Sequence, residues 1–146
     1  MKRLLIIITA ICLVQLSCKK NNWFNVINNT LDGKWKMVVV KDNATGQEMT
    51  KPDSVKGDVE ITFVTTGPSS GSFSGHTLVN SIDGGSYTTG SNHTISIKGF
   101  SMTQIYELPW ADFFTNNFGS AYQYSFTSDG KLTVVTAIKT LVFLRE

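Results

Sequence analysis

The chain has 146 residues, with 13 Lys and Arg against 11 Asp and Glu, two Cys and two His. Lys2 and Arg3 belong to an N-terminal segment that we expect to be removed, which leaves 11 basic and 11 acidic residues. A neutral domain lacks the basic footprint of nucleic-acid binding proteins. Both cysteines lie within the first 18 residues, so the rest of the chain has no thiol for a nucleophile, a metal site or a disulfide.

The first residues have the pattern of an export signal. Met1-Lys2-Arg3 precedes 13 mostly apolar residues, 4–16, and Ser17 follows them. A charged start, a short apolar run and a small residue at the cut site are typical of a secretory signal. The run is shorter than the roughly 20 residues that span a bilayer as a helix.

The end of this segment, Leu16-Ser17-Cys18, resembles the lipobox of bacterial lipoproteins, in which the cysteine is acylated and the peptide before it is removed. The resemblance implies that Cys18 is the lipidation site and that acyl chains hold the protein in a membrane. Lys19 stands where an aspartate would favour the inner membrane, so we expect an outer-membrane lipoprotein of the bacterial envelope, with its side left open. An ordinary signal peptide with an incidental Cys18 is the alternative.

We therefore expect three parts: a lipoprotein signal peptide at 1–17, the acylated cysteine with a short polar tether at 18–30, and one folded domain at 31–146. The domain shows short alternating or β-branched segments separated by turn residues, which predicts an all-β structure. In the first segment, Trp35, Met37 and Val39 are expected to share one face. The predicted strands are 34–41, 59–65, 72–80, 86–89, 94–98, 122–127, 131–137 and 140–145.

Two Gly-containing segments are expected to be turns. Residues 83–85, Asp-Gly-Gly, are predicted to bound the short fourth strand. Asp129-Gly130 is predicted to form a tight primed turn, because such turns need residues that accept positive φ.

A helix is predicted over 109–118, since its aromatic residues recur at spacings of three and four. Pro109 and Gly119 are typical of a helix start and stop. We thus predict a mainly β fold, a small antiparallel β-barrel of about eight strands with one short helix before the last three. The aromatic face is expected to be core, with a pocket for a small apolar ligand as the alternative. Its residues are Trp110, Phe113, Phe114 and Phe118.

Short motifs follow one another along the domain: Gly33-Lys34-Trp35, Ile61-Thr62-Phe63, Phe73-Ser74-Gly75, Asn80, Gly85-Ser86-Tyr87-Thr88, Thr94-Ile95-Ser96-Ile97, Ser101-Met102-Thr103, Lys131-Leu132-Thr133-Val134 and Leu141-Val142-Phe143. In this order and spacing, residues 31–146 resemble the META domain family of HslJ-like envelope lipoproteins. The resemblance implies a non-enzymatic binding or structural domain linked to envelope stress tolerance. Its partner would be an envelope protein or a small apolar ligand.

This chain departs from many META domains at two places, because Val79 and residues 101–104 stand where those domains carry a probable cysteine pair. The opening Gly33-x-Trp35 is also shared with lipocalins, in which the tryptophan closes the barrel floor. A lipocalin-like carrier of a small apolar ligand is therefore the alternative fold and function.

Few residues of the domain are suited to chemistry. His76 and His93 are the only histidines, and a metal site would need a third ligand. Asp58 and Glu60 alternate along a predicted strand and are expected on its solvated face. We predict no catalytic residue, metal or cofactor. The remaining enzymatic alternative is an envelope hydrolase that uses His76 with Asp83.

Asn80 is the polar residue with the clearest expected role. It lies in the strongest part of the family resemblance and next to a Gly-rich segment. Asparagine side chains commonly hydrogen-bond nearby backbone at turns. We predict that Asn80 bonds backbone groups and fixes a corner of the barrel, in preference to contacting a ligand.

Overall fold

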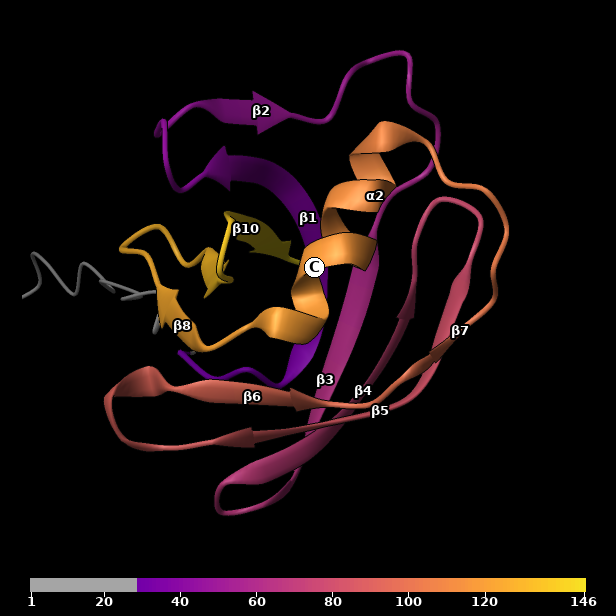
Figure 1. The fold of residues 1–146 in the computed structure, drawn as a ribbon. Coiled ribbons are helices and arrows are strands. Elements are labelled where there is room, and N and C mark those ends of the chain that lie inside the picture. Colours follow the sequence, from indigo (N-terminus) through magenta and orange to yellow (C-terminus); the bar gives the residue numbers. More distant parts are fainter. Residues whose placement is uncertain (1–28) are drawn as a thin grey trace, which may run out of the picture.

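The computed structural model describes residues 29–146, and the ribbon in Figure 1 follows them in colour. The signal segment 1–17, Cys18 and the tether before residue 29 lie outside the described residues. The elements are β1 (Gly33–Asp42), β2 (Glu48–Thr50), β3 (Glu60–Gly67), β4 (Ser70–His76), β5 (Ser81–Thr89), η2 (Ser91–His93), β6 (Ile95–Lys98), β7 (Ser101–Met102), α2 (Pro109–Asn117), η3 (Phe118–Ser120), β8 (Gln123–Phe126), β9 (Leu132–Val135) and β10 (Lys139–Arg145).

Eight of the strands form a nearly closed antiparallel barrel. Its hydrogen-bonded order is β6-β5-β4-β3-β1-β10-β9-β8, with β2 attached to β1 and β7 attached to β5. The seam between β6 and β8 is held by a bridge between Thr94 and Gln123, and the Ile95 N–H donates to the Tyr122 carbonyl over 3.0 Å. The predicted barrel of about eight strands, with one short helix before the last three, is confirmed.

The expected inward face of β1 is correct only for its first half. Trp35 and Met37 are buried, but the next core residue is Val40 and not Val39. The pairing with β10 shifts between Met37 and Val39, so Val38 is an extra residue opposite the partner strand. A β-bulge of this kind turns the following side chains to the other face.

The prediction of a turn at 83–85 is wrong. The chain instead turns at 77–80, and β5 begins at Ser81. Gly84 has a φ of 67° and lies inside β5, where the register with β4 shifts. Turns and bulges both use positive-φ glycine, so the sequence pattern did not separate them.

Asp129-Gly130 does join β8 to β9, although the primed turn is wrong, because only Gly130 of the two takes a positive φ, 79°. The alternating pattern also did not predict β2 or β7. These strands have three and two residues, which is too short for a period of two to be recognised.

Helix α2 and η3 fill the barrel, as Figure 1 shows for the helix inside the curved sheet. The Phe114 ring stacks on that of Phe118 with centroids 4.6 Å apart. Phe118 also meets Phe73 of β4 at 5.3 Å, and Phe114 meets Phe143 of β10 at 6.4 Å. The aromatic face is core, as predicted, and only Phe113 lies outside it, under the Lys139 ammonium.

The start and end of the domain are tied together over Trp35. The Trp35 indole N–H donates to the Leu31 carbonyl over 2.7 Å, and the Arg145 guanidinium lies 4.3 Å from the ring centroid. Arg145 also donates to the carbonyls of Thr30 and Asp32, at 2.5 and 2.6 Å. The penultimate residue of the chain thus closes one end of the barrel over its first strand.

Gly75 is expected to tolerate no side chain. A Cβ at this position would lie 2.1 Å from the Glu60 carbonyl oxygen and 2.9 Å from the Ile61 Cα, both of which are backbone atoms. Because backbone cannot rotate away, we expect Gly75→Ala to lower the free energy of unfolding by at least about 2 kcal/mol in urea denaturation. Gly99→Ala, with no heavy atom within 4 Å, is the control. Equal stability of the two variants would contradict the packing described.

Candidate functional site

Asn80 fixes the corner at which the 77–80 turn meets the extended segment before α2. Its side-chain amide donates to the Ile105 carbonyl over 2.8 Å, and its Oδ1 accepts from the Ile105 N–H over 2.7 Å. Oδ1 also accepts from the Thr103 hydroxyl over 2.9 Å. The predicted backbone-bonding role of Asn80 is therefore confirmed, and its bonds hold residues 103–107 against the turn.

Beneath this corner lies Glu107, which is only 5% exposed. Its Oε1 accepts from the Asn80 amide over 2.6 Å and from the Thr77 hydroxyl. Its Oε2 is buried and has no hydrogen-bond partner among residues 29–146. Buried polar atoms in proteins are nearly always partnered, so this oxygen is unusual. The role of Glu107 was not predicted, because a single acidic residue before Leu-Pro carries no signal of burial in the sequence.

The surface over Glu107 is apolar. Four exposed residues make up what we call the corner patch: Val79, Ile105, Tyr106 and Leu108, of which Tyr106 is 87% exposed. They come from the turn and the extended segment that Asn80 joins. Exposed apolar side chains that gather on a soluble surface often mark a site of interaction.

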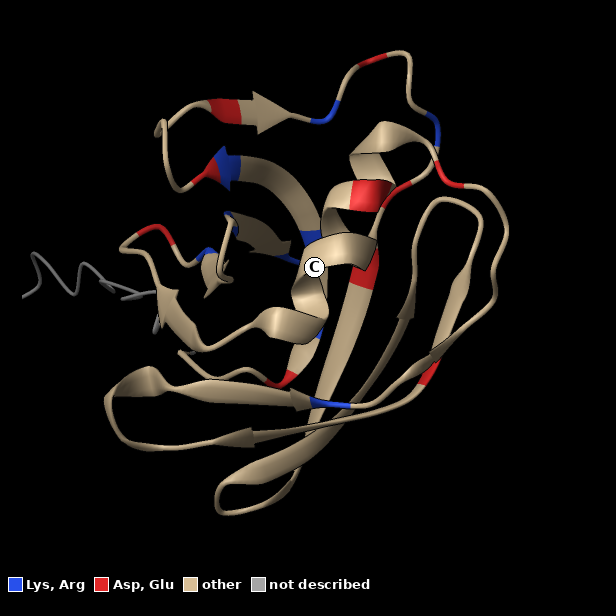
Figure 2. Ribbon diagram, viewed as in Figure 1, with Lys and Arg blue, Asp and Glu red and all other residues tan. Residues whose placement is uncertain are grey.

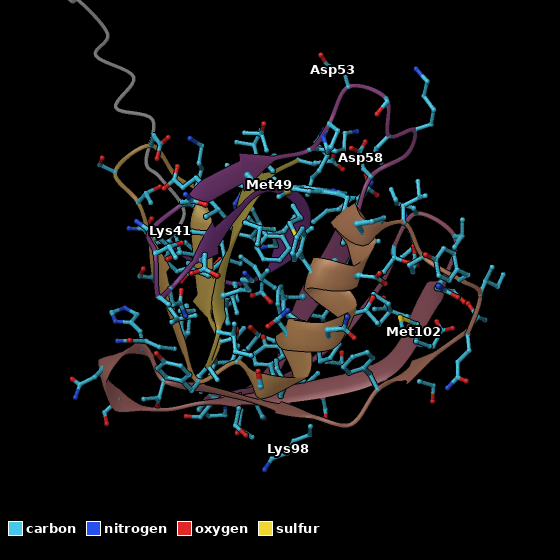
Figure 3. The ribbon with its side chains drawn as sticks, turned by 45° about the horizontal axis from the view of Figure 1, so that its top comes forward. Lys41, Met49, Asp53, Asp58, Lys98 and Met102 are labelled. Atoms are coloured by element: carbon cyan, nitrogen blue, oxygen red, sulfur yellow. The ribbon has the colours of Figure 1, made fainter. Side chains whose placement is uncertain are left out.

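A shallow cleft of about 510 Å³ adjoins the corner patch. In Figure 3, the labelled Met102 marks this flank of the molecule, on the other side of α2 from Met49 and Lys41. We call this hollow the corner cleft. It is lined by Asn80, Met102, Thr103, Gln104, Ile105, Tyr106, Glu107, Asp112 and Thr115.

Elsewhere, ion pairs neutralise most of the surface charge. Lys34 contacts Glu60 at 2.6 Å and Glu146 at 2.8 Å, and Lys51 contacts Asp58 at 2.7 Å. Its bonds to Glu146 and then to Glu60 raise the pKa of Lys34, and the bond from Lys51 lowers that of Asp58. Asp58 and Glu60 are thus held in ion pairs, but the expected solvated strand face is wrong, because Asp58 precedes β3 and the Glu60 side chain is only 13% exposed.

Asp42 provides a test of these pairs by pH. Its carboxylate lies 2.6 Å from the Lys139 ammonium and accepts from the Thr45 N–H and hydroxyl, and these bonds hold its pKa well below the usual value. Such a group stabilises the fold above its unfolded pKa of about 3.9, and this contribution is lost as the pH falls through the lower folded pKa. We expect Asp42→Asn to lower Tm at pH 7.

The difference in Tm between the parent chain and Asp42→Asn should shrink below about pH 4, as the carboxyl of the parent protonates. Thermal melts by circular dichroism from pH 7 to pH 2 measure it. Asp53→Asn serves as the control, because Asp53 is exposed and forms no ion pair among the described residues. A difference that stays constant down to pH 2 would argue against the Lys139 contact.

The two histidines lie in separate environments. His76 Nε2 is 2.9 Å from Glu60 Oε2, and its Nδ1 is 3.0 Å from the Thr77 carbonyl. The His93 ring meets that of Tyr124 edge-on at 5.4 Å, within the turn before β6. The acidic neighbour of His76 is thus Glu60, and not the Asp83 of the hydrolase alternative.

Within residues 29–146, no three His, Cys, Asp or Glu side chains gather as a metal site would require. No helix in this part of the chain has the length and apolar character needed to cross a bilayer. The corner patch and the cleft beside it remain the most distinctive surface of the described domain.

Comparisons with known proteins find a similar fold but give no information on the activity of this chain. No protein-family model matches the chain, and no curated protein is significantly similar to it. A solved structure that is similar is the NMR structure of a protein from Burkholderia xenovorans, with 17% sequence identity and a TM-score of 0.57. The match covers 79% of this chain and 82% of that chain. At this level of identity the likeness shows a shared fold alone.

Proposed function

We propose that this chain is an outer-membrane lipoprotein of a bacterial envelope, anchored through acylated Cys18. Its META-like barrel would be a non-enzymatic domain that binds an envelope partner in stress tolerance. The anchor rests on the signal pattern and on Leu16-Ser17-Cys18, and the domain type rests on the order of motifs along residues 31–146.

The observation that carries the binding role is the corner patch. Its four apolar residues are exposed on the 77–80 turn and on the segment that the Asn80 side chain bonds to this turn. Rigid presentation reduces the entropy lost when a partner binds. A carrier of small apolar ligands has less support, because Phe114 and Phe118 occupy the barrel interior where the ligand would lie. The hydrolase has less support, because His76 faces Glu60.

Acylation of Cys18 is tested by mass spectrometry of the mature protein from membranes of a bacterial host. We expect the N-terminal peptide to begin at Cys18 and to carry the mass of a diacylglycerol group, because only two or more chains anchor a protein stably. Cys18→Ser should leave the protein unprocessed and without this mass. Protease shaving of intact cells then reports its side of the membrane. Cleavage at another residue, with an unmodified thiol at Cys18, would contradict the anchor.

Binding at the corner patch is tested in the same cells by site-specific photo-crosslinking. A photoreactive residue at position 106 should give a discrete adduct, because Tyr106 is 87% exposed within the patch. The same residue at position 98 should give none, since Lys98 ends β6 and does not line the corner cleft. Identical patterns from the two positions would argue against a partner at the corner.

A further inference from the structure

Every charged side chain that lines the corner cleft is acidic. Glu107 and Asp112 are its only charged lining residues. Among residues 29–146, neither carboxylate forms an ion pair, and the lysines without such a pair, Lys56 and Lys98, do not line the cleft. Residues 101–120 contain no Lys or Arg at all, and Figure 2 correspondingly shows no blue along this stretch.

A helix N-terminus explains part of this charge. Asp112 lies in the first turn of α2, and Glu107 precedes the helix by two residues, where acidic side chains interact favourably with the helix dipole. The dipole does not account for Glu107 Oε2, which is buried without a hydrogen-bond partner in the described chain. Glu107 thus adds an acceptor oxygen without a donor among the described residues to the cleft that Asp112 also lines.

The remaining lining suits a basic side chain with an apolar stem. Tyr106 offers an exposed aromatic ring, the surface on which a guanidinium or ammonium group is favourably placed. Ile105 beside it offers contact to methylene groups, and the Asp112 carboxylate offers a charged acceptor. Neither an anionic nor a wholly apolar occupant would pair with the Asp112 carboxylate.

We propose that the corner cleft receives a lysine or arginine side chain that a partner protein presents between apolar residues. This inference rests on the proposed binding function of the corner patch and specifies the chemistry of the partner. The basic group binds over Tyr106 and beside Asp112, and the flanking apolar residues cover Ile105, Leu108 and Val79.

The corner cleft lies on the side of the barrel away from the proposed membrane anchor, so a partner reaches it from the side that faces away from the membrane. Thr30 and Leu31, where the described chain begins, line a different cleft together with Tyr124 of β8. In Figure 1 this start lies at the left beside β8, whereas β7 and the segment that leads from it to α2 lie at the right. The tethered side and the corner are therefore at opposite flanks of the barrel.

The test uses the full chain in lipid nanodiscs and a capped synthetic pentapeptide with one arginine between two pairs of leucines. Binding is followed by NMR chemical shifts of the backbone amides. We expect shifts at residues 103–108 and 112, and weaker binding at higher salt. A matched peptide carries citrulline, the neutral analogue of arginine, and should bind several-fold more weakly.

Three variants locate the contact. Asp112→Asn should weaken the arginine peptide by up to about fivefold, the range for an exposed ion pair, and should leave the citrulline peptide unchanged. Tyr106→Ala should weaken the arginine peptide by about tenfold, as expected for an aromatic anchor, and the neutral citrulline peptide by less, since citrulline forms no cation–π contact. Asp53→Asn, an exposed carboxylate outside the cleft, is the charge control.

The outcomes separate this inference from the proposed function. Equal binding of the two peptides, shifts confined to residues outside the corner patch and the corner cleft, or no shift at millimolar peptide each overturn the basic partner. The proposed function fails instead if position 106 gives no specific adduct in cells. An adduct at position 106 with no preference for arginine retains the patch and removes the charge specificity.

Discussion

Phe118→Ala is expected to be among the most destabilising single substitutions in the domain, with a loss of about 3–5 kcal/mol in the free energy of unfolding. Phe118 is fully buried and meets rings from three directions, Phe114, Phe73 and Phe63. Its removal would leave a cavity between the helix and two strands, and these walls are too well packed to collapse into it. Urea denaturation followed by fluorescence measures the loss.

Phe113→Ala is the matched control, because it removes the same side chain from the outer face of α2. Phe113 is only partly buried and its main described partner is the Lys139 ammonium, 5.7 Å from the ring centroid. We expect a loss of about 1–2 kcal/mol for this variant, from partial burial and a cation–π contact. If the two variants lost equal stability, α2 would not be seated in the barrel as described.

Asn80→Ala is expected to cost about 3 kcal/mol or more and to release the corner. The substitution leaves the Ile105 N–H and carbonyl, the Thr103 hydroxyl and Glu107 Oε1 each without one hydrogen bond. A buried polar group that loses its partner costs about 1–3 kcal/mol. Hydrogen exchange should therefore speed up at residues 103–107 beyond the change explained by global stability.

The control for Asn80→Ala is Asn116→Ala, at an exposed asparagine on α2. It should change stability by less than about 0.5 kcal/mol, the usual range for such surface positions. If Asn80→Ala destabilised the protein and binding at position 106 stayed unchanged, the corner would not need rigid support. Uniformly faster exchange throughout the domain would show that Asn80 acts on the whole fold.

The β-barrel and its helix were predictable because long segments repeat their pattern. Residues 59–63 alternate apolar and polar residues, and α2 repeats aromatic residues every three or four positions. Each pattern reflects one continuous buried face. The bulge at Val38 and that at Gly84 were not predictable, because a single inserted residue is set by the partner strand and not by local sequence.

The candidate site was predictable only in part. Asn80 was identified, because it lies next to a Gly-rich segment, where asparagine side chains commonly hydrogen-bond backbone. Glu107 was missed, since its burial depends on contacts with Thr77 and Asn80, which lie 30 and 27 residues away. The exposure of Tyr106 was also not predictable, because the sequence around an isolated aromatic residue in a loop does not indicate whether its side chain is buried or exposed.

The placement of Arg145 over Trp35 bears on when the protein can fold during its biosynthesis. These residues pair directly across β1 and β10, at a separation of 110 positions in the chain. Strand β1 pairs with β3 on one side and with β10 on the other, so its second side stays unpaired until the last strand has been synthesised. Contacts of such sequence separation form late and slowly. If the proposed signal exports the chain, a chain still inside the secretion channel lacks β10 and has an incomplete barrel. Closure of the barrel is therefore among the last steps of its folding.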